Sequence, residues 1–315
     1  MKLAVSILNF RTPELTLDAI QATINALASI QGGWKIVVVD NDSQDGSEEK
    51  LREAIQEKQN ENTNGWNQIE LHQTGHNGGF GSGNNFAINY AREAFPDVEY
   101  IYILNSDAFP DKDAIKCLVD FLDEHNDYGF AGSYIYGVDG TPHETAFRFP
   151  SAFGELEGSI RFGPVSKLLK KYQVPVGIPE ASLDVDWLAG ASVLMRIQTL
   201  EEIGIFDETF FLYFEETDLL LRANRAGWRT RYILESKVAH VGSASTGMKK
   251  WERIPQYWLD SRKHYFTKNH GRIYFLWATL LRIFGGSLFT LRCLIQGKSN
   301  PDPKRFLRDM LSHAI

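Results

Sequence analysis

Short apolar runs alternate, along the first half of the chain, with segments whose apolar residues recur every three or four positions. Leu3–Leu8 is the first run, and Thr12-Pro13-Glu14 follows it as a helix start with proline in the first turn. The helical pattern then continues through Leu17, Ile20, Ile24 and Leu27. The same order returns twice, with strands and helices at Trp34–Val39, Ser47–Ile55, Glu99–Leu104 and residues 115–122. Repeated strand–helix units predict an α/β fold with a mostly parallel, doubly wound sheet.

The composition is that of an ordinary enzyme-sized globular chain. The 315 residues are 43% hydrophobic and 12% aromatic with a net charge of −7, which excludes disordered, collagen-like and small disulfide-stapled proteins. The two cysteines, Cys117 and Cys293, form no disulfide framework, so we expect a reducing, cytoplasmic compartment. Met1–Phe10 is too short for a secretory leader and fits a first buried strand better.

Charge is unevenly distributed along the chain. Residues 249–315 carry thirteen Lys/Arg and four Asp/Glu, a net of +9, which leaves −16 on residues 1–248 and argues against nucleic acid as a partner of the larger part. Arg282 and Arg292 divide the apolar stretch Ile273–Ile295 into uncharged runs of nine residues, short of the roughly 18 to 20 of a spanning helix. Two interpretations stay open: a segment on an anionic membrane surface, or a helix packed on its own domain or on a second subunit of a homo-oligomer.

Polar residues follow two of the predicted strands, at the edge where such sheets bind ligands. After Val39 comes Asp40-Asn41-Asp42-Ser43-Gln44-Asp45-Gly46-Ser47, whose carboxylates can accept hydrogen bonds from a base or ribose, although these residues are also common in turns. After Leu104 comes Asn105-Ser106-Asp107, with an amide and a carboxylate on one side of an extended chain. A diphosphate-bound Mg²⁺ or Mn²⁺ needs only one or two protein carboxylates, so this strand end is a candidate cation site.

A glycine-rich segment, His76-Asn77-Gly78-Gly79-Phe80-Gly81-Ser82-Gly83-Asn84-Asn85, lies between the two strand ends. It does not fit a dinucleotide-binding fingerprint, because it does not follow the first strand and lacks an acidic residue about twenty positions on. We expect a loop whose glycines let the backbone approach a ligand, with Asn84 or Asn85 capping the next helix. A purely structural loop is the alternative.

Taken in order, these segments closely resemble the inverting glycosyltransferases of family 2, especially their bacterial rhamnosyltransferase-like branch. The resemblance covers about residues 3–270 and implies a GT-A fold that binds a nucleoside-diphosphate sugar over the carboxyl edge of the sheet. The segments that carry it are Val5–Phe10, Val38–Ser47, Asn77–Asn85, Leu104–Asp107, Asp186–Ala191, Gly204–Leu219 and Val238–Ser243.

The resemblance also implies roles for particular side chains. Asp107 and His240 would hold Mg²⁺ or Mn²⁺, with Asn105 or Ser106 in the outer shell of the cation. The acceptor would contact Asp186 and Trp187. The nucleotide-sugar donor would be bound by Asn9, Arg11, Asp40, Asp42, Asn77, Gly79, Phe80, Asn84 and Ser106.

The acceptor hydroxyl needs a base, because it is a poor nucleophile at neutral pH. By position in the family's acidic pair this role falls on Glu216, where the family usually has aspartate, and Glu215 is the alternative. The plain structural reading is that these carboxylates and Asp218 form the acidic first turn of a helix that stops before Gly227, with Asp218 and Arg222 as an i,i+4 pair. Both readings can hold together.

The sequence therefore predicts a metal-dependent inverting hexosyltransferase with a catalytic domain at residues 1–248 and a helical extension at 249–315. The donor half would span about residues 1–110 and the acceptor half 111–248, with the aperiodic Thr141–Pro179 as a variable loop or lid. The expected reaction moves rhamnose or another hexose from a dTDP- or UDP-sugar to a glycan or lipid-linked saccharide, in bacterial surface polysaccharide synthesis at the cytoplasmic face of the membrane. A nucleotidyltransferase and a catalytically silent glycan- or nucleotide-binding module are the alternatives.

Overall fold

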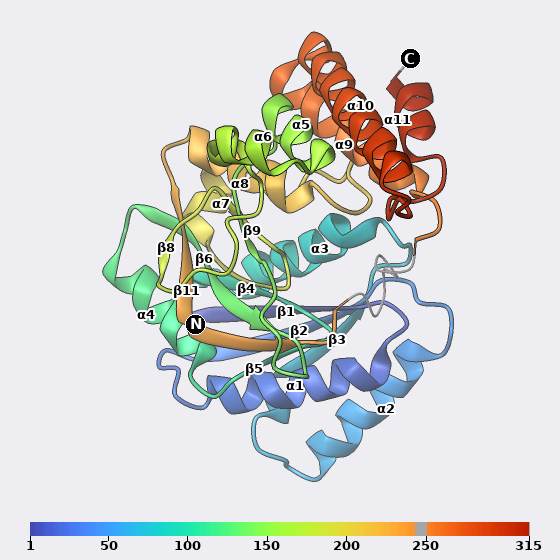
Figure 1. Cartoon of the computed structure of the whole chain (residues 1–315). Helices are drawn as coiled ribbons and strands as arrows, with labels where there is room; N and C mark the ends of the chain where they lie inside the picture. Colours follow the sequence, from blue (N-terminus) through green and yellow to red (C-terminus); the bar gives the residue numbers. More distant parts are fainter. Residues whose placement is uncertain (243–250, 315) are drawn as a thin grey trace.

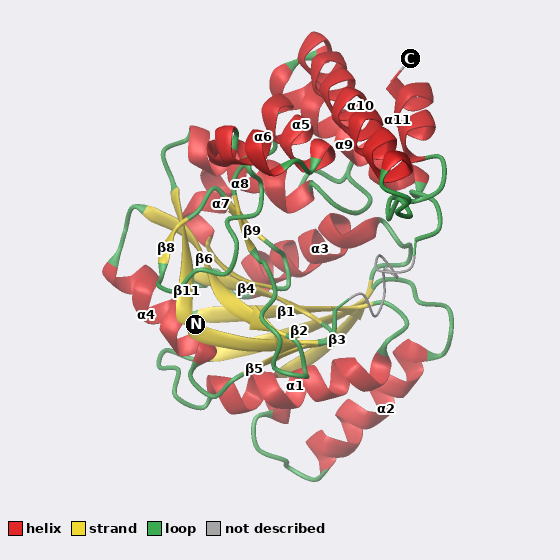
Figure 2. Ribbon diagram, viewed as in Figure 1, coloured by secondary structure: helices red, strands yellow, loops and turns green. Residues whose placement is uncertain are grey.

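A computed structural model describes residues 1–242 and 251–314 as a sheet with helices packed on both faces (Figure 1; Figure 2). The predicted domain boundary at 248/249 and Ser243 of the last motif lie outside the described residues. The strands are β1 (Leu3–Asn9), β2 (Trp34–Asp40), β3 (Ile69–Gln73), β4 (Tyr100–Asn105), β5 (Ala108–Pro110), β6 (Tyr128–Tyr136), β7 (Ala146–Phe147), β8 (Leu183–Asp184), β9 (Trp187–Leu188), β10 (Ser192–Arg196) and β11 (Arg229–His240). The helices are α1 (Pro13–Leu27), α2 (Ser47–Asn60), α3 (Gly79–Ala94), α4 (Ala114–Glu124), α5 (Ala152–Ile160), α6 (Gly163–Leu168), α7 (Ile197–Ile203), α8 (Glu215–Arg225), α9 (Gln256–His270), α10 (Arg272–Ile295) and α11 (Phe306–Ala314).

The sheet has a parallel half and a mixed half. The parallel half has the order β3-β2-β1-β4, and β10 then pairs antiparallel with both β4 and β6. Beyond β6 lies the parallel neighbour β11, which pairs antiparallel with β5 and β8. The predicted α/β fold with a mostly parallel sheet is confirmed, and its antiparallel pairs lie in the mixed half.

Two helical layers cover the sheet. Leu3, Val5 and Ile7 of β1 pack with apolar residues of α1, α2 and α4, whereas Ala4 packs in the opposite layer with α3, α7 and α8 (Figure 2). Because both faces of the sheet are buried, the strands read as continuous apolar runs. The carboxyl ends of β1, β2 and β4 therefore meet at one edge, where the polar residues predicted to bind ligands follow each strand.

The C-terminal helices α9, α10 and α11 pack on one another and reach α5 and α8 (Figure 1). α10 is an unbroken helix of 24 residues, long and apolar enough to cross a membrane by length and composition alone. The expectation that Arg282 and Arg292 make this stretch too short is therefore wrong. Both arginines turn toward the protein: Arg282 donates to Glu155 at 2.9 Å, and Arg292 donates to the carbonyls of Ile160 and Arg161.

Two local expectations are also wrong. Thr141–Pro179 is not a plain loop, because it contains β7, α5 and α6. The buried face of α5 is made largely of small and polar residues, so it shows no hydrophobic period in the sequence. The glycine-rich segment is helical from Gly79 onward, so Asn84 and Asn85 lie inside α3 and do not cap it.

Candidate active site

A buried hydrogen-bond network centred on Asp40 joins the ends of β1 and β2. The Asp40 side chain is completely buried, and its two oxygens accept from Asn9 Nδ2 (2.6 Å), Ser43 N (3.0 Å), Ser43 Oγ (2.6 Å) and Gln73 Nε2 (3.0 Å). A carboxylate with this many donors is fully satisfied, and it fixes the loop that follows β2. The contact of Asp40 with a ribose or base stays a prediction, since in this structure protein donors occupy both oxygens.

A cleft of about 250 Å³ lies over the carboxyl ends of β1, β2 and β4. Asn77, Gly79, Phe80 and Ser106 line it, as predicted for donor-binding residues, together with Asp107. These residues come from two separate segments, the start of α3 and the end of β4. Asn105, predicted for the outer shell of the cation, lines the cleft as well, so the fold brings six of the predicted site residues to one wall.

Gly79 has to be glycine because of a close approach. Its φ is +91°, and a Cβ built there would lie 1.8 Å from the carbonyl oxygen of Phe211. The next residue, Phe80, donates its backbone N–H to that same carbonyl at 3.0 Å. This contact brings the chain that leads to Glu215 and Glu216 against the cleft.

Asp107 and His240 form a close pair at the cleft. His240 Nε2 lies 3.0 Å from Asp107 Oδ1, and the backbone N–H of Gly242 donates to Asp107 Oδ2 at 3.1 Å. Burial alone would raise the pKa of Asp107, but the hydrogen bond and charge of His240 outweigh burial and hold that pKa below its ordinary value. An ionised carboxylate beside an imidazole is a donor set that fits Mn²⁺ or Mg²⁺. Within residues 1–242 and 251–314 no group of three His, Cys, Asp or Glu is placed to hold a metal, so diphosphate oxygens and water would have to complete the coordination.

α8 begins at a turn with unusual backbone geometry. Tyr213 and Phe214 have φ values of 70° and 71°, a left-handed conformation that non-glycine residues seldom adopt and that only strong surroundings maintain. Aromatic rings supply these surroundings: Trp251 and Tyr257 lie 5.7 and 6.3 Å from the Tyr213 ring, and Trp258 lies 5.8 Å from the Phe214 ring. The segment from 251 onward thus supports the turn that presents the acidic residues of α8.

Glu215 and Glu216, the first two residues of α8, are carboxylates with few partners. Burial, reinforced by the charge of Glu216, holds the pKa of Glu215 well above its ordinary value. Burial also raises the pKa of Glu216, against the opposing effect of the Gly190 N–H, which donates to Glu216 Oε1 at 3.4 Å. In the described part of the chain, Oε2 of each glutamate is buried without a hydrogen-bond partner. Carboxylates in this state are suited to accept a proton.

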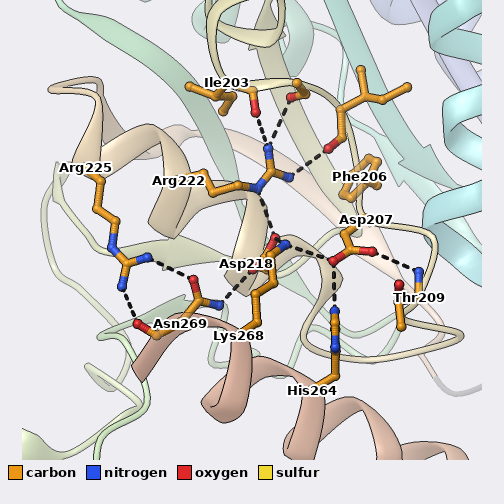
Figure 3. A network of polar contacts seen from close by, with 12 residues as sticks. Ile203, Phe206, Asp207, Thr209, Asp218, Arg222, Arg225, His264, Lys268 and Asn269 are labelled. Atoms are coloured by element: carbon orange, nitrogen blue, oxygen red, sulfur yellow. Dashed lines mark hydrogen bonds and ion pairs between the residues drawn. The ribbon is translucent and has the colours of Figure 1, made fainter. Parts of the chain in front are cut away.

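Further along α8, Asp218 and Arg222 tie the helix to its neighbours (Figure 3). Arg222 Nε donates to Asp218 Oδ2 at 3.0 Å, which confirms the predicted i,i+4 pair, and the other guanidinium nitrogens donate to backbone carbonyls of residues 203–205. Asp218 is completely buried and also accepts from Lys268 (2.7 Å) and Asn269 (2.8 Å) of α9. This network fixes α8 between α7 and α9.

A second cavity, of about 370 Å³, lies beside Glu216. Its wall includes Trp187, Gly154 of α5 and Arg282 of α10. Residues 150–217 and the C-terminal helices therefore build this cavity together, just as Tyr257 of α9 contributes to the first cleft.

Asp186 and Trp187, the predicted acceptor residues, behave differently in the structure. Trp187 lines the second cavity, stacked on Phe147 with ring centroids 4.2 Å apart and donating Nε1–H to the carbonyl of Arg148 at 3.0 Å. Asp186 instead accepts from the backbone N–H of Phe149 at 2.8 Å. Trp187 is thus placed to meet a ligand, whereas Asp186 holds the backbone beside it.

Gly190 lies between the two cavities. A Cβ built on Gly190 would lie 2.9 Å from the Phe80 ring and 3.5 Å from Glu216 Oε1. Phe80 lines the first cleft and Glu216 the second. The carboxylate of Glu216 and the Phe80 ring therefore approach the same point beside Gly190, which places Glu216 next to the wall of the first cleft.

Some predicted donor residues do not line the cleft. Asn9 and Asn84 are completely buried, and Asn84 bridges Ser6 Oγ (2.8 Å) and the carbonyl of Phe80 (3.0 Å). Arg11 is exposed and donates to the carbonyl of Ser43 at 3.0 Å. Asp42 is half-buried and accepts from Gln44 at 2.8 Å. Asn9 and Asn84 therefore stabilise the backbone behind the wall of the cleft. The contacts of all four residues with the nucleotide sugar stay predictions.

Other residues line the cleft although the sequence did not single them out. They are Leu8, Phe10, Asn41, Phe211, Leu212 and Tyr257. The first three lie inside or next to the strand-end motifs, which is the signal that could have identified them. Tyr257 had no such signal, because only the packing of α9 brings it there. His143 was also missed, and its ring lies 6.3 Å from that of His240.

Comparison with known proteins identifies the class that this fold and cleft define. The family model for Glycosyl transferase family 2 matches residues 14–187, more than half of the chain. A similar curated protein is the N-acetylglucosaminyl-diphospho-decaprenol L-rhamnosyltransferase of Mycobacterium tuberculosis, 27% identical over 220 residues that cover 67% of this chain and 68% of that protein.

Solved structures share the fold. S. aureus TarS 1–349 in complex with UDP-GlcNAc gives a TM-score of 0.56 at 13% identity and covers 94% of this chain and 73% of that chain. Mannosyltransferase PcManGT from Pyrobaculum calidifontis, in complex with GDP-Man and Mn²⁺, gives 0.52 at 12% identity and covers 99% and 85%. This chain spans 44% of a longer TarS chain. At such low identity the likeness shows the GT-A fold alone.

The chain belongs to glycosyl transferase family 2, and the predicted resemblance to that family and its rhamnosyltransferase-like branch is confirmed. The protein is therefore a glycosyltransferase by family, which disfavours the nucleotidyltransferase alternative. The family match ends at residue 187, so the roles of Glu215, Glu216 and His240 rest on the geometry of the site.

Proposed function

We propose that this protein is a cation-dependent, inverting hexosyltransferase that moves rhamnose or another hexose from a dTDP- or UDP-sugar to a lipid-linked saccharide or glycan. The name of the mycobacterial relative specifies L-rhamnosyl transfer and a diphospho-decaprenol acceptor, which supports this choice of sugar and acceptor class. The UDP-GlcNAc bound to TarS supports a nucleotide-sugar donor. The setting that we propose is surface polysaccharide synthesis at the cytoplasmic face of a bacterial membrane.

The donor would lie in the cleft, with its diphosphate beside Asp107 and His240. These two side chains would hold Mg²⁺ or Mn²⁺, which supplies Lewis-acid neutralisation of the charge on the leaving diphosphate. The 3.0 Å contact between their polar atoms supports this assignment, because both groups already point to one place at the cleft. Asn77 and Phe80 form the wall along which the rest of the donor would bind.

The acceptor would occupy the cavity beside Trp187, whose indole face suits a sugar ring. Glu216 takes the proton of the acceptor hydroxyl, and the hydroxyl oxygen bonds to the anomeric carbon. The bond from that carbon to the donor diphosphate breaks at the same time, and its electron pair leaves with the diphosphate. Attack on the face opposite the leaving group inverts the anomeric centre. Glu215 lines neither cavity, which favours Glu216 as the base.

The observation that carries this proposal is the position of Glu216, which lines the second cavity next to a residue of the donor cleft. Its Oε1 and the Phe80 ring both lie within 3.5 Å of the point that a Cβ on Gly190 would occupy. A base for glycosyl transfer has to reach the acceptor where the acceptor meets the donor, and Glu216 has this position. A binding module has no need for a buried carboxylate there.

The test is nucleoside diphosphate release from a panel of dTDP-, UDP- and GDP-sugars, with and without Mn²⁺ or Mg²⁺. We expect the wild type to use one donor in a cation-dependent way, with release lost in Asp107→Ala and reduced in Glu216→Gln. Asp113→Ala, which removes an exposed carboxylate nearby in the sequence, is the matched control and should retain release.

The possible failures separate the parts of the proposal. Release that needs no cation would contradict the metal role of Asp107 and His240. Cation-dependent donor binding without release would indicate a missing acceptor. A protein that binds no donor would favour the silent binding module instead.

A further inference from the structure

The outward face of α10 is a continuous apolar stripe. Its members recur every three or four residues and are between 38% and 86% exposed. They are Ile273, Leu276, Trp277, Leu280, Phe284, Leu288, Leu291, Leu294 and Ile295. At 1.5 Å per residue the helix is about 36 Å long, so the stripe greatly exceeds the isolated exposed hydrophobic residues of an ordinary surface.

The opposite face of α10 is fixed on the protein. Arg282 forms an ion pair with the buried Glu155 of α5 at 2.9 Å. At Gly285 the two helices approach so closely that a Cβ would lie 2.2 Å from Ser159 Oγ, and at Gly286 a Cβ would lie 2.7 Å from Leu307. The helix therefore cannot rotate to bury its stripe, and its packed face and ion-paired arginine argue against a membrane-spanning orientation.

The surroundings of the stripe are basic. Arg272 at the start of α10 and Lys298 just beyond its end are exposed, whereas Arg282 and Arg292 turn toward the protein. Lys167 of α6, and Lys170 and Lys171 just after it, add exposed basic charge beside α10, where Arg161 pairs with Asp302 and lies over the Phe289 ring at 4.5 Å. An apolar stripe bordered by cations, with a tryptophan near one end, is complementary to an anionic lipid surface.

This charge also argues against a second copy of the chain as the occupant. A symmetric dimer through α10 would place the same basic surroundings of both copies against each other. Like charges facing one another disfavour such an interface, whereas anionic headgroups neutralise them.

We infer that the outward face of α10 lies in the headgroup region of an anionic bilayer leaflet, parallel to the membrane. This surface is separate from the reaction. One consequence rests on the proposed function: Arg282 of the same helix lines the cavity assigned to the acceptor, so the docked helix holds that cavity within about one helix diameter, 10–12 Å, of the lipid. A lipid-linked saccharide could then enter the cavity while its lipid stays in the membrane.

The experiment is flotation of the full chain with vesicles of phosphatidylglycerol and phosphatidylcholine, and with vesicles of phosphatidylcholine alone. We expect binding to the anionic vesicles, reduced about tenfold or more in Leu280→Gln/Phe284→Gln because two apolar side chains no longer favour insertion. Val138→Gln/Ile178→Gln, which changes two exposed apolar residues far from α10 in the sequence, should bind like the wild type. Binding should also weaken at 1 M salt, where the screening length falls to about 3 Å.

Wild type that fails to float with anionic vesicles would overturn the inference, and so would equal flotation of the wild type and the α10 variant. Sedimentation that shows a wild-type dimer and a monomeric α10 variant would assign the stripe to a second copy instead. If circular dichroism shows that the double variant is unfolded, Trp277→Phe gives an independent measurement. Anionic vesicles should shift the tryptophan fluorescence emission to shorter wavelength, and the shift should be larger in the wild type than in Trp277→Phe. Equal emission shifts in the two proteins would overturn the inference. None of these readouts depends on sugar transfer, so a failure of the proposed function stays distinguishable.

Discussion

Two buried acidic sites in this protein are built in opposite ways. At the end of β2, Asp40 accepts four hydrogen bonds from side chains and backbone of the surrounding loop and strands. At the start of α8, Glu215 is buried and Glu216 is half-buried; each has one buried oxygen that finds no partner among the described residues, and burial raises the pKa of both. Both sites lie beside ligand-sized cavities, so location alone does not distinguish them.

The difference separates a structural carboxylate from a reactive one. Four hydrogen bonds satisfy the carboxylate of Asp40 and hold it in place. The acidic pair of α8 has fewer such hydrogen bonds, and burial raises the pKa of both carboxyls, so each reduces stability where it is ionised. The predictions below test this contrast.

The largest expected effect is on catalysis. Glu216→Gln removes the proposed base, so transfer to the acceptor should fall by about 10²–10⁴-fold while donor binding is retained. Steady-state transfer and donor titration measure the two quantities, and Glu53→Gln on the exposed side of α2 is the control. Full activity of Glu216→Gln with loss in Glu215→Gln would assign the base to Glu215.

The next effect is on stability at the satisfied site. Asp40→Ala leaves the donors of Asn9, Ser43 and Gln73 without their acceptor, and we expect the free energy of unfolding to fall by about 2–4 kcal/mol. Urea denaturation measures the change. Asp42→Ala removes one hydrogen bond from Gln44 in the same loop and should cost less than about 0.5 kcal/mol. Equal losses in the two variants would remove the distinction between Asp40 and its neighbour.

Glu215→Gln should raise the free energy of unfolding, whereas Asp40→Ala should lower it. The folded-state pKa of Glu215 is raised, so its ionisation favours unfolding once the pH exceeds the unfolded pKa of about 4.3. Glutamine stays neutral, so the variant should be more stable than the wild type by about 1–3 kcal/mol at pH 8, and this gain should disappear near pH 4. Denaturation at both pH values is the measurement, and a variant less stable at pH 8 would contradict the raised pKa.

The positions of the contrasting carboxylates could be predicted from the sequence, but the hydrogen bonding that makes them differ could not. Asp40 and Asp107 were located because each follows an apolar run, and Glu216 was located by its position in the acidic pair of the family that the sequence resembles. What the sequence could not show is how many donors each carboxylate has, because Gln73 and Gly190 are distant in the chain.

Contacts between residues that are distant in the chain also explain the remaining errors in predicting the fold. The packed face of α5 is built largely from small and polar residues and becomes complementary to α10 only in three dimensions. The glycines at the start of α3 indicated a loop, but at Gly79 the close approach of the Phe211 carbonyl requires glycine at a helix start. Local patterns predicted β1, β2 and β4 of the parallel half because each strand–helix unit there is continuous in the chain, but they did not predict the edge strand β3. Tyr257 and Arg282 reach their cavities only through the packing of the C-terminal helices.

The smallest expected effect concerns the support of α8. Lys268 donates to Asp207 at 2.8 Å and to the buried Asp218 at 2.7 Å, and its own side chain is partly exposed (Figure 3). Lys268→Met keeps the apolar stem and removes both ion pairs, so we expect a loss of about 1 kcal/mol at neutral pH. Lys263→Met on the same helix removes one bond to a backbone carbonyl and should change stability by less than about 0.5 kcal/mol.

The pH dependence of this last effect has a defined sign. Burial would raise the pKa of Asp207, but hydrogen bonds from Lys268 and His264 outweigh burial and lower that pKa. A lowered folded-state pKa contributes stability that is present above the unfolded pKa of about 3.9 and is lost as the pH falls through the folded value. The deficit of Lys268→Met should therefore be complete at pH 7 and narrow below about pH 4, as measured by urea denaturation. A deficit that stays constant through acid pH would mean that Lys268 acts by packing rather than by charge, and α8 would then be held mainly by Arg222.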